Sequence, residues 1–593
     1  MPLYAARPAI RITVAGILIV VAGCSAGSGV RPDPQSATTS TEPPTTTTRA
    51  TTIPSRYGGT VVVGVGDAGS PRTLNPFLDG PDAAVLDLIG PAIFARGWIA
   101  HPVTGLPVAD VLESVPSLGN GLVVDNGNGT MEVTAVVQGG AHWADGMPIS
   151  GDDLAFTIAV ATDPDLPIRG DLADLYGLIL PGSVRPSPKS VTFTMEATTA
   201  YERLFAVIIP RHGVEGSDFA ADWNDEAWIE AGPFVVGEFV AGQLLSLERN
   251  EEYWKTAEDG GALPYLDRVI FRFYESAADP DPRLLDGFNS GDIDLVALAS
   301  AQDTAEPYLA LEDAEVTTAP GPIWTFLNFQ FGPGNRNAIS QNRHLEYRRA
   351  VAHAIDREAL ALERGTAPVS SVLSRFGLAS GEGPWDQYAY NLDAVESELF
   401  ALSQLIDLDP FAGDGLDLSL TVPGNSAAEI AIAGQVVTML RDAGFDAELQ
   451  LEDSAVFFGP TFDNGAWDVG SWGLSSAPGA SNAAAFFTIF DPDGLPFVGS
   501  NFFRWGTIDS TVTGEAVDRY RDLVDELQGL IDPAEASILM ALAEEILADQ
   551  VVFIPLVVRD DVGVAWWASR VEGVTLNPYG GIAWNVASWR RIG

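Results

Sequence analysis

The chain contains a single cysteine, Cys24, among 593 residues, and this limits how it can be stabilised. One cysteine cannot form an intrachain disulfide, so a hydrophobic core must supply the stability. The composition is suited to this, because 46% of the residues are hydrophobic and 14 are tryptophan. A chain of this length is expected to fold into several domains with large cores.

Residues 1–24 have the pattern of an export signal. Arg7 and Arg11 flank the start of an apolar run over 12–22 that only Thr13 interrupts. A membrane-spanning helix needs about 20 apolar residues, so this run has the length of a signal peptide. It ends in Val-Ala-Gly-Cys at 21–24, which resembles a bacterial lipobox. The resemblance implies cleavage before Cys24 and lipidation of its thiol, and an uncleaved anchor helix or a chance cysteine is the alternative interpretation.

The segment that follows predicts a tether. Residues 24–57 are rich in Ser, Thr and Pro and contain few apolar residues. Such a composition cannot offset the entropy lost on ordering, so we predict a disordered stalk. We therefore expect a lipoprotein signal peptide over 1–23, the stalk over 24–57 and a folded body over 58–593. The lipid would hold the chain at the outer face of the cell membrane.

The charge of the chain excludes some partners. The formal net charge is −48 and the pI is about 4.1, and Lys189 and Lys255 are the only lysines. Such a field argues against nucleic acid, and against anionic ligands unless arginines cluster locally. It is compatible with cationic solutes, but solubility at a salty or acidic surface explains it as well.

Strand and helix patterns alternate along the body. A β-branched run occupies 60–63, and a second strand pattern occupies 269–274. Residues 416–422 alternate, Ser426 is a helix cap three residues before Glu429, and residues 447–451 alternate again. These three segments predict a βαβ unit, and the chain as a whole is predicted to be α/β with mixed sheets.

No catalytic, metal or cofactor site is predicted. Gly64 to Gly69 spells G-x-G-x-x-G after a strand, but Pro71 and Pro76 oppose the helix that dinucleotide binding requires. The five histidines are scattered, and no hydrolase elbow or P-loop is present. Paired acids are uninformative in a chain with 80 Asp and Glu residues.

A series of segments along 60–590 is more informative than any single motif. Together, in this order, they resemble the family 5 extracellular solute-binding proteins, the oligopeptide, dipeptide and nickel receptors of ABC importers. The segments are Thr-Leu-Asn-Pro at 73–76, the His-Trp-Ala-Asp-Gly run within 139–154, Gly-Pro-Phe at 232–234, Leu-Glu-Arg-Asn-Glu-Glu-Tyr-Trp at 247–254, Pro-Tyr-Leu-Asp at 264–267, Gly-Asp-Ile-Asp at 291–294, Leu-Asn at 327–328, the run from Glu346 to Arg357, Ala-Gly-Phe at 443–445 and Asp-Val-Gly-Ser-Trp at 468–472.

The resemblance implies a fold and a division into lobes. It implies the type II periplasmic-binding-protein architecture in its large peptide-receptor subclass, with two α/β lobes, a hinge and mixed sheets. We expect lobe I over 58–318, lobe II over 319–554 and a return of residues 555–593 to lobe I. The Ala-Pro-Gly-Pro turn at 319–322 and Pro555 are compatible with the two crossings.

The resemblance also nominates ligand-binding residues. By matching segments these are Asn75 and Phe77 from lobe I, and Trp324, Phe326 and Trp472 from lobe II. For each aromatic residue, core packing is the competing explanation. Peptide receptors of the family carry an aspartate three residues after this tryptophan, where the chain has Ser475. A neutral serine cannot make a charge-assisted bond to a peptide ammonium, so an ordinary free N-terminus is in doubt.

Three functions therefore stay open. The first is a lipid-anchored, non-enzymatic receptor for peptides or peptide-like solutes that delivers them to an ABC permease. The second is the same receptor for another solute, such as a sugar oligomer or a metal chelate. The third is a secreted hydrolase. For the receptor we expect a small solute, the permease complex and the membrane as partners, no nucleic acid, and a monomeric protein.

Overall fold

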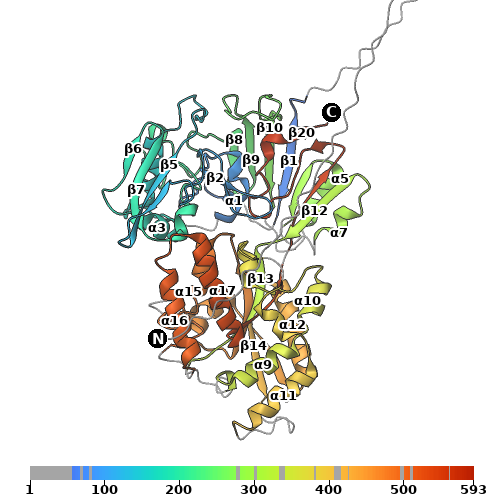
Figure 1. Ribbon diagram of the computed structural model, residues 1–593. Helices are drawn as coiled ribbons and strands as arrows, with labels where there is room; N and C mark the ends of the chain where they lie inside the picture. Colours follow the sequence, from blue (N-terminus) through green and yellow to red (C-terminus); the bar gives the residue numbers. More distant parts are fainter. Residues whose placement is uncertain are drawn as a thin grey trace, which may run out of the picture. The chain divides into compact units, whose positions relative to one another are not determined.

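The computed structural model describes residues 56–66, 71–78, 83–274, 281–298, 304–332, 341–379, 382–406, 416–424, 426–494, 500–507, 512–559 and 561–592. The predicted signal peptide, Cys24 and the predicted stalk up to residue 55 lie outside these residues. The described residues fall within one compact unit, Pro54–Gly593 (Figure 1). Among them, no helix has both the length and the apolar character needed to cross a membrane.

Lobe I is built on a seven-stranded mixed sheet. Its central strand β1 (Thr60–Val65) runs parallel to both neighbours, β10 (Arg268–Phe273) and β11 (Leu295–Leu298). The β-branched run of β1 buries Val61 and Val63 completely, as suits a central strand. The outer strands pair antiparallel with their neighbours, and these are β9 (Leu244–Arg249), β8 (Phe234–Val240), β18 (Asp561–Trp567) and β12 (Ala314–Pro320).

The glycines of the G-x-G-x-x-G run have a packing role. A Cβ at Gly64 would lie 2.7 Å from Leu284 Cδ2, and one at Gly66 would lie 2.8 Å from Leu284 Cδ1. Leu284 belongs to α5 (Pro282–Ser290), so these glycines allow α5 to lie close to β1.

A four-stranded antiparallel sheet completes lobe I. Its order is β4 (Val123–Asp125), β5 (Thr130–Val136), β7 (Ser190–Glu196) and β6 (Arg185–Ser187). Helix α2 (Gly151–Ala161) packs on it, and its N-cap is Ser150, whose backbone N–H donates to Asp153 Oδ2 at 2.8 Å. Asp145 and Gly146 lie in a turn before this helix, with Gly146 at φ +81°.

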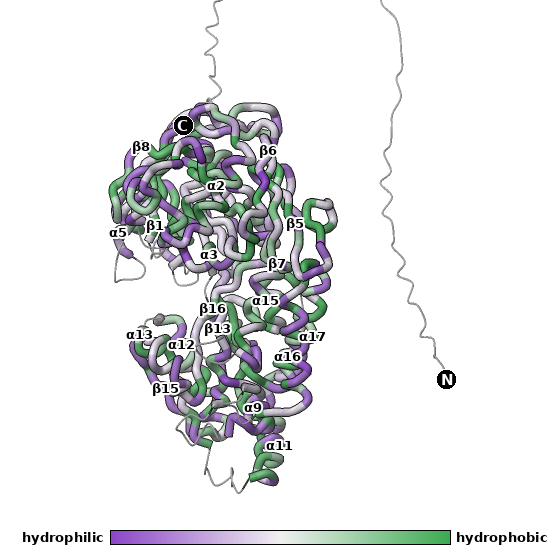
Figure 2. The backbone as a smooth tube through the Cα atoms, turned by 90° about the vertical axis from the view of Figure 1, so that its left-hand side faces the viewer, coloured by the Kyte–Doolittle hydropathy of each residue, from purple (hydrophilic) through white to green (hydrophobic). Residues whose placement is uncertain are grey.

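Lobe II contains a five-stranded sheet between two layers of helices. The predicted βαβ unit is confirmed as β14 (Asp417–Pro423), α12 (Ala427–Asp442) and β15 (Asp446–Glu452), with the two strands parallel. The sheet continues through β16 (Val469–Ser475), β13 (Ile323–Phe329) and β17 (Phe553–Val558). Figure 2 shows β13 and β16 with α12 on one side and α15 (Ala480–Thr488) and α17 (Pro533–Asp549) on the other.

The remaining helices surround these sheets. The longer of them are α1 (Ala83–Ile89), α3 (Gly170–Gly177), α9 (Leu345–Ala354), α10 (Arg357–Glu363), α11 (Leu392–Ser403) and α16 (Glu515–Leu527).

The chain crosses between the two large sheets twice. The first crossing joins β12 to β13 and the second joins β17 to β18. Residues 319–320 thus belong to a lobe I strand, and 555–558 belong to a lobe II strand, whereas we expected each boundary a few residues earlier. Pro555 does not end β17, because β17 is an edge strand, where a missing backbone N–H is tolerated.

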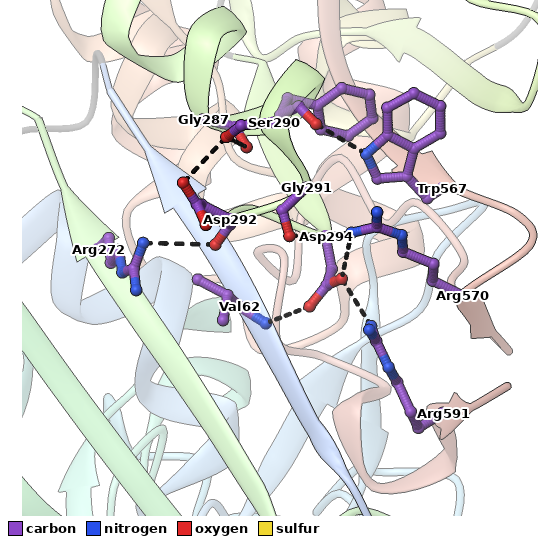
Figure 3. Close-up of polar contacts among 11 residues, drawn as sticks. Val62, Arg272, Gly287, Ser290, Gly291, Asp292, Asp294, Trp567, Arg570 and Arg591 are labelled. Carbon is purple, nitrogen blue, oxygen red and sulfur yellow. Dashed lines mark hydrogen bonds and ion pairs between the residues drawn. The ribbon is translucent and has the colours of Figure 1, made fainter. Parts of the chain in front are cut away.

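The C-terminal segment is fixed to lobe I by a buried carboxylate (Figure 3). Asp294, from the Gly-Asp-Ile-Asp motif, is 4% exposed. It accepts hydrogen bonds from Val62 N at 3.0 Å and Arg591 Nη1 at 2.6 Å, and it lies 3.5 Å from Arg570 Nη1. Arg570 also donates to Gly291 O at 2.9 Å. This motif therefore joins β1, the α5–β11 turn and the last turns of the chain.

Candidate ligand site between the lobes

The strand directions define the edge of lobe II that faces lobe I. Both crossings reach this lobe where β13 begins and β17 ends. Strand β16 is antiparallel to β13, and β14 is parallel to β16, so β14 and β16 both end at that edge. Ligands of open α/β sheets bind outside the carboxyl ends of the strands. The edge next to the crossings is therefore the expected binding edge.

A cavity of about 310 Å³, here called the interlobe cavity, is lined from both lobes. Lobe I contributes residues of α1, of α3 and of the short 3₁₀ helix η2 (Thr199–Arg203). Lobe II contributes Pro478, Gly479 and other residues of the segment that joins β16 to α15. The returning C-terminal segment adds Tyr579 and Trp584. The volume is within the range of small-molecule sites, roughly 300–1,000 Å³.

The lobes touch at the rim of this cavity. Gly105 lies in the turn between β2 (Trp98–Ala100) and β3 (Pro107–Ala109), with φ +69°. A Cβ at this position would lie 2.2 Å from Pro478 Cγ. Glycine is therefore required both by the backbone conformation and by the close approach of lobe II.

A second cavity, the hinge cavity, has a volume of about 370 Å³. It is lined by the ends of β1 and β11, the start of β18, and Pro322 from the first crossing. Asp87 and Tyr579 line both cavities, so the two adjoin. The hinge cavity thus lies at the carboxyl ends of the parallel strands of lobe I, which is the expected location in such a sheet.

Six charged side chains line the interlobe cavity. Arg169 and Asp171 form a bidentate pair, with Nε–Oδ1 at 3.1 Å and Nη2–Oδ2 at 3.0 Å. The other four make no hydrogen bond or ion pair with the part of the chain that the structure describes, and they are Asp87, Arg96, Glu202 and Arg203. The Nε of Arg96 is buried and has no hydrogen-bond partner among these residues.

The surroundings disfavour the charged forms of these four groups. Burial raises the pKa of Glu202 to about 7. Burial also raises the pKa of Asp87, an effect that Arg96 partly offsets. The pKa values of Arg96 and Arg203 are lowered, again mainly by burial. Arg96, Glu202 and Arg203 are half-buried and therefore carry a desolvation cost in the empty protein, whereas Asp87 is exposed to solvent.

The two residues nominated from lobe I have different surroundings. Asn75 is buried, its Nδ2 donates to Phe219 O at 3.0 Å and its Oδ1 accepts from Phe77 N at 3.0 Å. These bonds shape the turn that presents Phe77. Phe77 packs edge-on against Phe219 and Trp228 and also lines the interlobe cavity.

The residues nominated from lobe II lie on two adjacent strands. Trp324 and Phe326 are fully buried in β13, and Trp472 of β16 is 6% exposed. The rings of Phe326 and Trp472 are 5.3 Å apart, within the aromatic core of this lobe. Ser475 is exposed at the end of β16 and pairs with Ile323 at the binding edge. In this conformation, Trp324 and Phe326 present no surface to a ligand.

The sequence patterns did not nominate the charged residues of the cavity. Asp87, Arg96, Arg169 and the pair Glu202–Arg203 come from separate segments of lobe I, and none lies in a segment that carries the family resemblance. The one available signal was the scarcity of positive charge, with 32 Lys and Arg in the chain. The low count of positive residues does not show which of them line the cavity, because only the tertiary fold brings their segments together.

Comparison with known proteins identifies the family. The family model described as "Bacterial extracellular solute-binding proteins, family 5 Middle" matches residues 128–493. The periplasmic alpha-galactoside-binding protein of Rhizobium meliloti is 25% identical over 49% of this chain and 46% of its own length. The oligopeptide-binding protein OppA of Mycobacterium bovis is 25% identical over 72% of this chain and 68% of its own length. The chain thus spans about half the length of the first curated relatives that it matches.

A solved structure supports the fold over both lobes. The ABC transporter substrate-binding protein CtaP of Listeria monocytogenes superposes with a TM-score of 0.70 at 20% identity, over 91% of this chain and 100% of its own. The fold is the predicted two-lobed type II architecture of the peptide-receptor subclass, with mixed sheets. The family match covers more than half of the sequence, and the chain belongs to the family 5 bacterial extracellular solute-binding proteins.

Proposed function

We propose that this protein is a lipid-anchored substrate-binding protein of an ABC importer, which captures peptides or peptide-like solutes between its lobes. The observation that carries the proposal is the interlobe cavity, because residues from both lobes and from the C-terminal return line it. A ligand bound there would contact both lobes at once. The match to an oligopeptide-binding relative supports peptides as the solute class.

Capture would proceed by hinge closure. The lobes are joined by two short crossings, one between β12 and β13 and the other between β17 and β18, and each crossing joins strands of different sheets. Closure is favoured when the ligand contacts the closed state better than the open one. The closed receptor would then deliver its solute to a membrane permease. Lipid on Cys24 would keep a monomeric receptor near that permease, at the outer face of the cell membrane.

A non-peptide solute is the second candidate, and Ser475 favours it. This neutral side chain stands at the binding edge, at the position where peptide receptors of the family carry an aspartate. The alpha-galactoside-binding relative is compatible with a sugar oligomer as the solute, and a metal chelate is a further alternative. A secreted hydrolase is the least supported function, because the family consists of binding proteins.

A thermal-shift screen of the full chain tests the proposal. The proposal predicts that a peptide pool raises the melting temperature, because a ligand that binds only the folded state stabilises it. If only sugars or chelates do so, the peptide assignment is wrong while the receptor role stands. If the stabilising compound is chemically converted during incubation, the receptor role is contradicted.

A further inference from the structure

Lobe I contains a further cavity, here called the small cavity, with a volume of about 70 Å³. It is lined by residues of and after the 3₁₀ helix η1 (Gly90–Ala92), by residues that follow β3 and β9, and by the C-terminal return. Organic solutes occupy sites of roughly 300–1,000 Å³, whereas a water molecule needs about 10–15 Å³. The small cavity therefore has room for an ion and a few water molecules, but not for the solute of a receptor.

Arg96 is a charged residue of the small cavity that lacks a partner. It makes no hydrogen bond or ion pair with any residue that the structure describes, and its Nε is buried. Arg375 and Arg504 also have a buried Nε without a partner, but each of them donates to a backbone carbonyl through Nη2. Arg96 thus carries a desolvation cost that no described contact offsets.

A series of contacts connects Arg96 to Lys255. Val111 N donates to Arg96 O at 2.9 Å, which places Asp110 beside Arg96 where the two segments pair. Asp110 forms an ion pair with Lys255 through Oδ1 and Nζ. Lys255 Nζ also lies 5.2 Å from the centre of the Trp254 ring. Four of these residues line the small cavity, which is only a few ångströms across, and they are Arg96, Asp110, Trp254 and Lys255.

The polar groups around the small cavity require an acceptor with negative charge. Guanidinium, ammonium and indole N–H groups donate hydrogen bonds and accept none. Trp254 Nε1, like Arg96 Nε, is buried without a partner among the described residues. The cavity has two cations, Arg96 and Lys255, but Asp110 is its only carboxylate, and Asp87, which attracts Arg96, is exposed and lies outside it. A buried excess of positive charge favours an anion over a water molecule.

We infer that the small cavity binds one small inorganic anion such as chloride, held by Arg96, Lys255 and the indole N–H of Trp254. Chloride accepts hydrogen bonds from several donors, carries one negative charge and has no donor of its own to satisfy. The site goes beyond the proposed receptor function, because it lies within lobe I and is too small for an organic solute. Arg96 also lines the interlobe cavity, so the anion would fix the orientation of a side chain at the solute site.

The side chain of Lys255 can report on the anion in the full chain. Lys189 and Lys255 are the only lysines, so carbon-13 labelling of the lysine Cε gives two resonances, which Lys255→Arg assigns. Burial lowers the pKa of Lys255 to about 8, and a nearby anion opposes this effect because it favours the charged form. Replacing sodium gluconate with sodium chloride at constant ionic strength should raise the pKa of Lys255 by at least about 0.5, with saturation.

Lys189 is the internal control for this titration, because it donates to Ile149 O at 2.8 Å and does not line the small cavity. Its pKa should not change with chloride. An unchanged pKa of Lys255 overturns the inference, and so does a rise that does not saturate or that Lys189 shares. No solute is present in the titration, so none of these outcomes bears on the receptor proposal.

Two variants assign the effect to the small cavity. Chloride should bind at least about tenfold more weakly to Arg96→Gln and more weakly by a smaller factor to Trp254→Phe, because each loses one donor. Both should fold, since the polar atoms removed make no bond within the described residues. Arg185→Gln matches the charge change at an exposed site, and Trp467→Phe removes a buried, unpartnered indole N–H from lobe II, so both should keep the wild-type affinity. Wild-type chloride affinity in Arg96→Gln and Trp254→Phe contradicts the inference.

Discussion

At the scale of single residues, the interlobe cavity differs from the rest of the protein in its unpaired charges. Most arginines with partners elsewhere in the described residues donate to carboxylates or backbone carbonyls. Arg249, for example, donates to Pro264 O at 3.0 Å and to Tyr265 O at 2.8 Å. Glu202 and Arg203 have no such partner within the described residues. The difference has a measurable consequence for stability, because the folded state shifts the protonation of Glu202.

We predict that Glu202→Gln stabilises the ligand-free protein above pH 7. Burial raises the pKa of Glu202 from its ordinary 4.5 to about 7. The folded protein therefore binds a proton that the unfolded chain has lost, so wild-type stability falls as pH rises from about 4.5 to 7. Glutamine carries no charge, and the gain at pH 8 should be about 1–2 kcal/mol after allowance for partial exposure. Thermal unfolding at several pH values measures this gain.

The pH profile also contains the control. The advantage of Glu202→Gln should vanish near pH 4, where the glutamate is protonated in both states. Glu258→Gln removes an exposed glutamate and should change stability little at any of these pH values. A pH-independent difference between wild type and Glu202→Gln would contradict the assigned shift.

At the scale of secondary-structure elements, residues of the segments that resemble the family connect strands, helices and turns to one another. Asp294 joins β1 to the C-terminal residues Arg570 and Arg591. Arg348 on α9 donates to Gln550 O at 2.6 Å and to Asn342 O at 2.6 Å, which fixes the end of α17. Each of these contacts stabilises the interior of one lobe. None of the residues that make them lines the interlobe cavity or the hinge cavity.

We predict that Asp294→Ala destabilises lobe I by about 2–3 kcal/mol, because it leaves Val62 N and two arginines without their acceptor. Glu572→Gln is the matched control, since it removes an exposed pair with Arg590 and should cost less than about 1 kcal/mol. Urea unfolding followed by tryptophan fluorescence measures both. Equal midpoints for Asp294→Ala and Glu572→Gln would show that the joint contributes nothing to stability.

The contrast between contacts close in sequence and contacts formed only by the tertiary fold explains how much could be predicted from sequence. Joints such as Ser150 with Asp153, or Ser426 with the N–H of Glu429, depend on residues a few positions apart, so local patterns identify them. The βαβ unit was predictable for the same reason, whereas the two-lobed class was predicted from the resemblance to the family. The cavity residues Arg96 and Arg203 meet only through tertiary folding, and their segments have no distinguishing pattern. Trp324 and Phe326 match the family segments, but their rings pack in the core of lobe II.

At the scale of the whole molecule, the described residues form a two-lobed body, and we propose that a lipidated stalk tethers it to the membrane. The body has a separate hydrophobic core in each lobe, and the lobes are joined by the crossings from β12 to β13 and from β17 to β18. This arrangement lets each lobe stay rigid while the angle between them changes. Without an intrachain disulfide, stability comes from these cores, so reducing conditions should not unfold the protein.

We predict that the mature protein begins at Cys24 and carries a diacylglycerol on that residue. Two acyl chains give stable membrane attachment, whereas one is marginal. Intact mass measurement of membrane-extracted protein should show loss of residues 1–23 and the added lipid. Cys24→Ala should yield unlipidated protein, and a lipid-sized mass increase in that variant would contradict the assignment.

Native mass spectrometry of the purified full chain most directly tests the central claim, that the two lobes hold a small solute for delivery. One small molecule per protein, released unchanged on denaturation, is the expected result. Release of a chemically altered product would contradict the central claim.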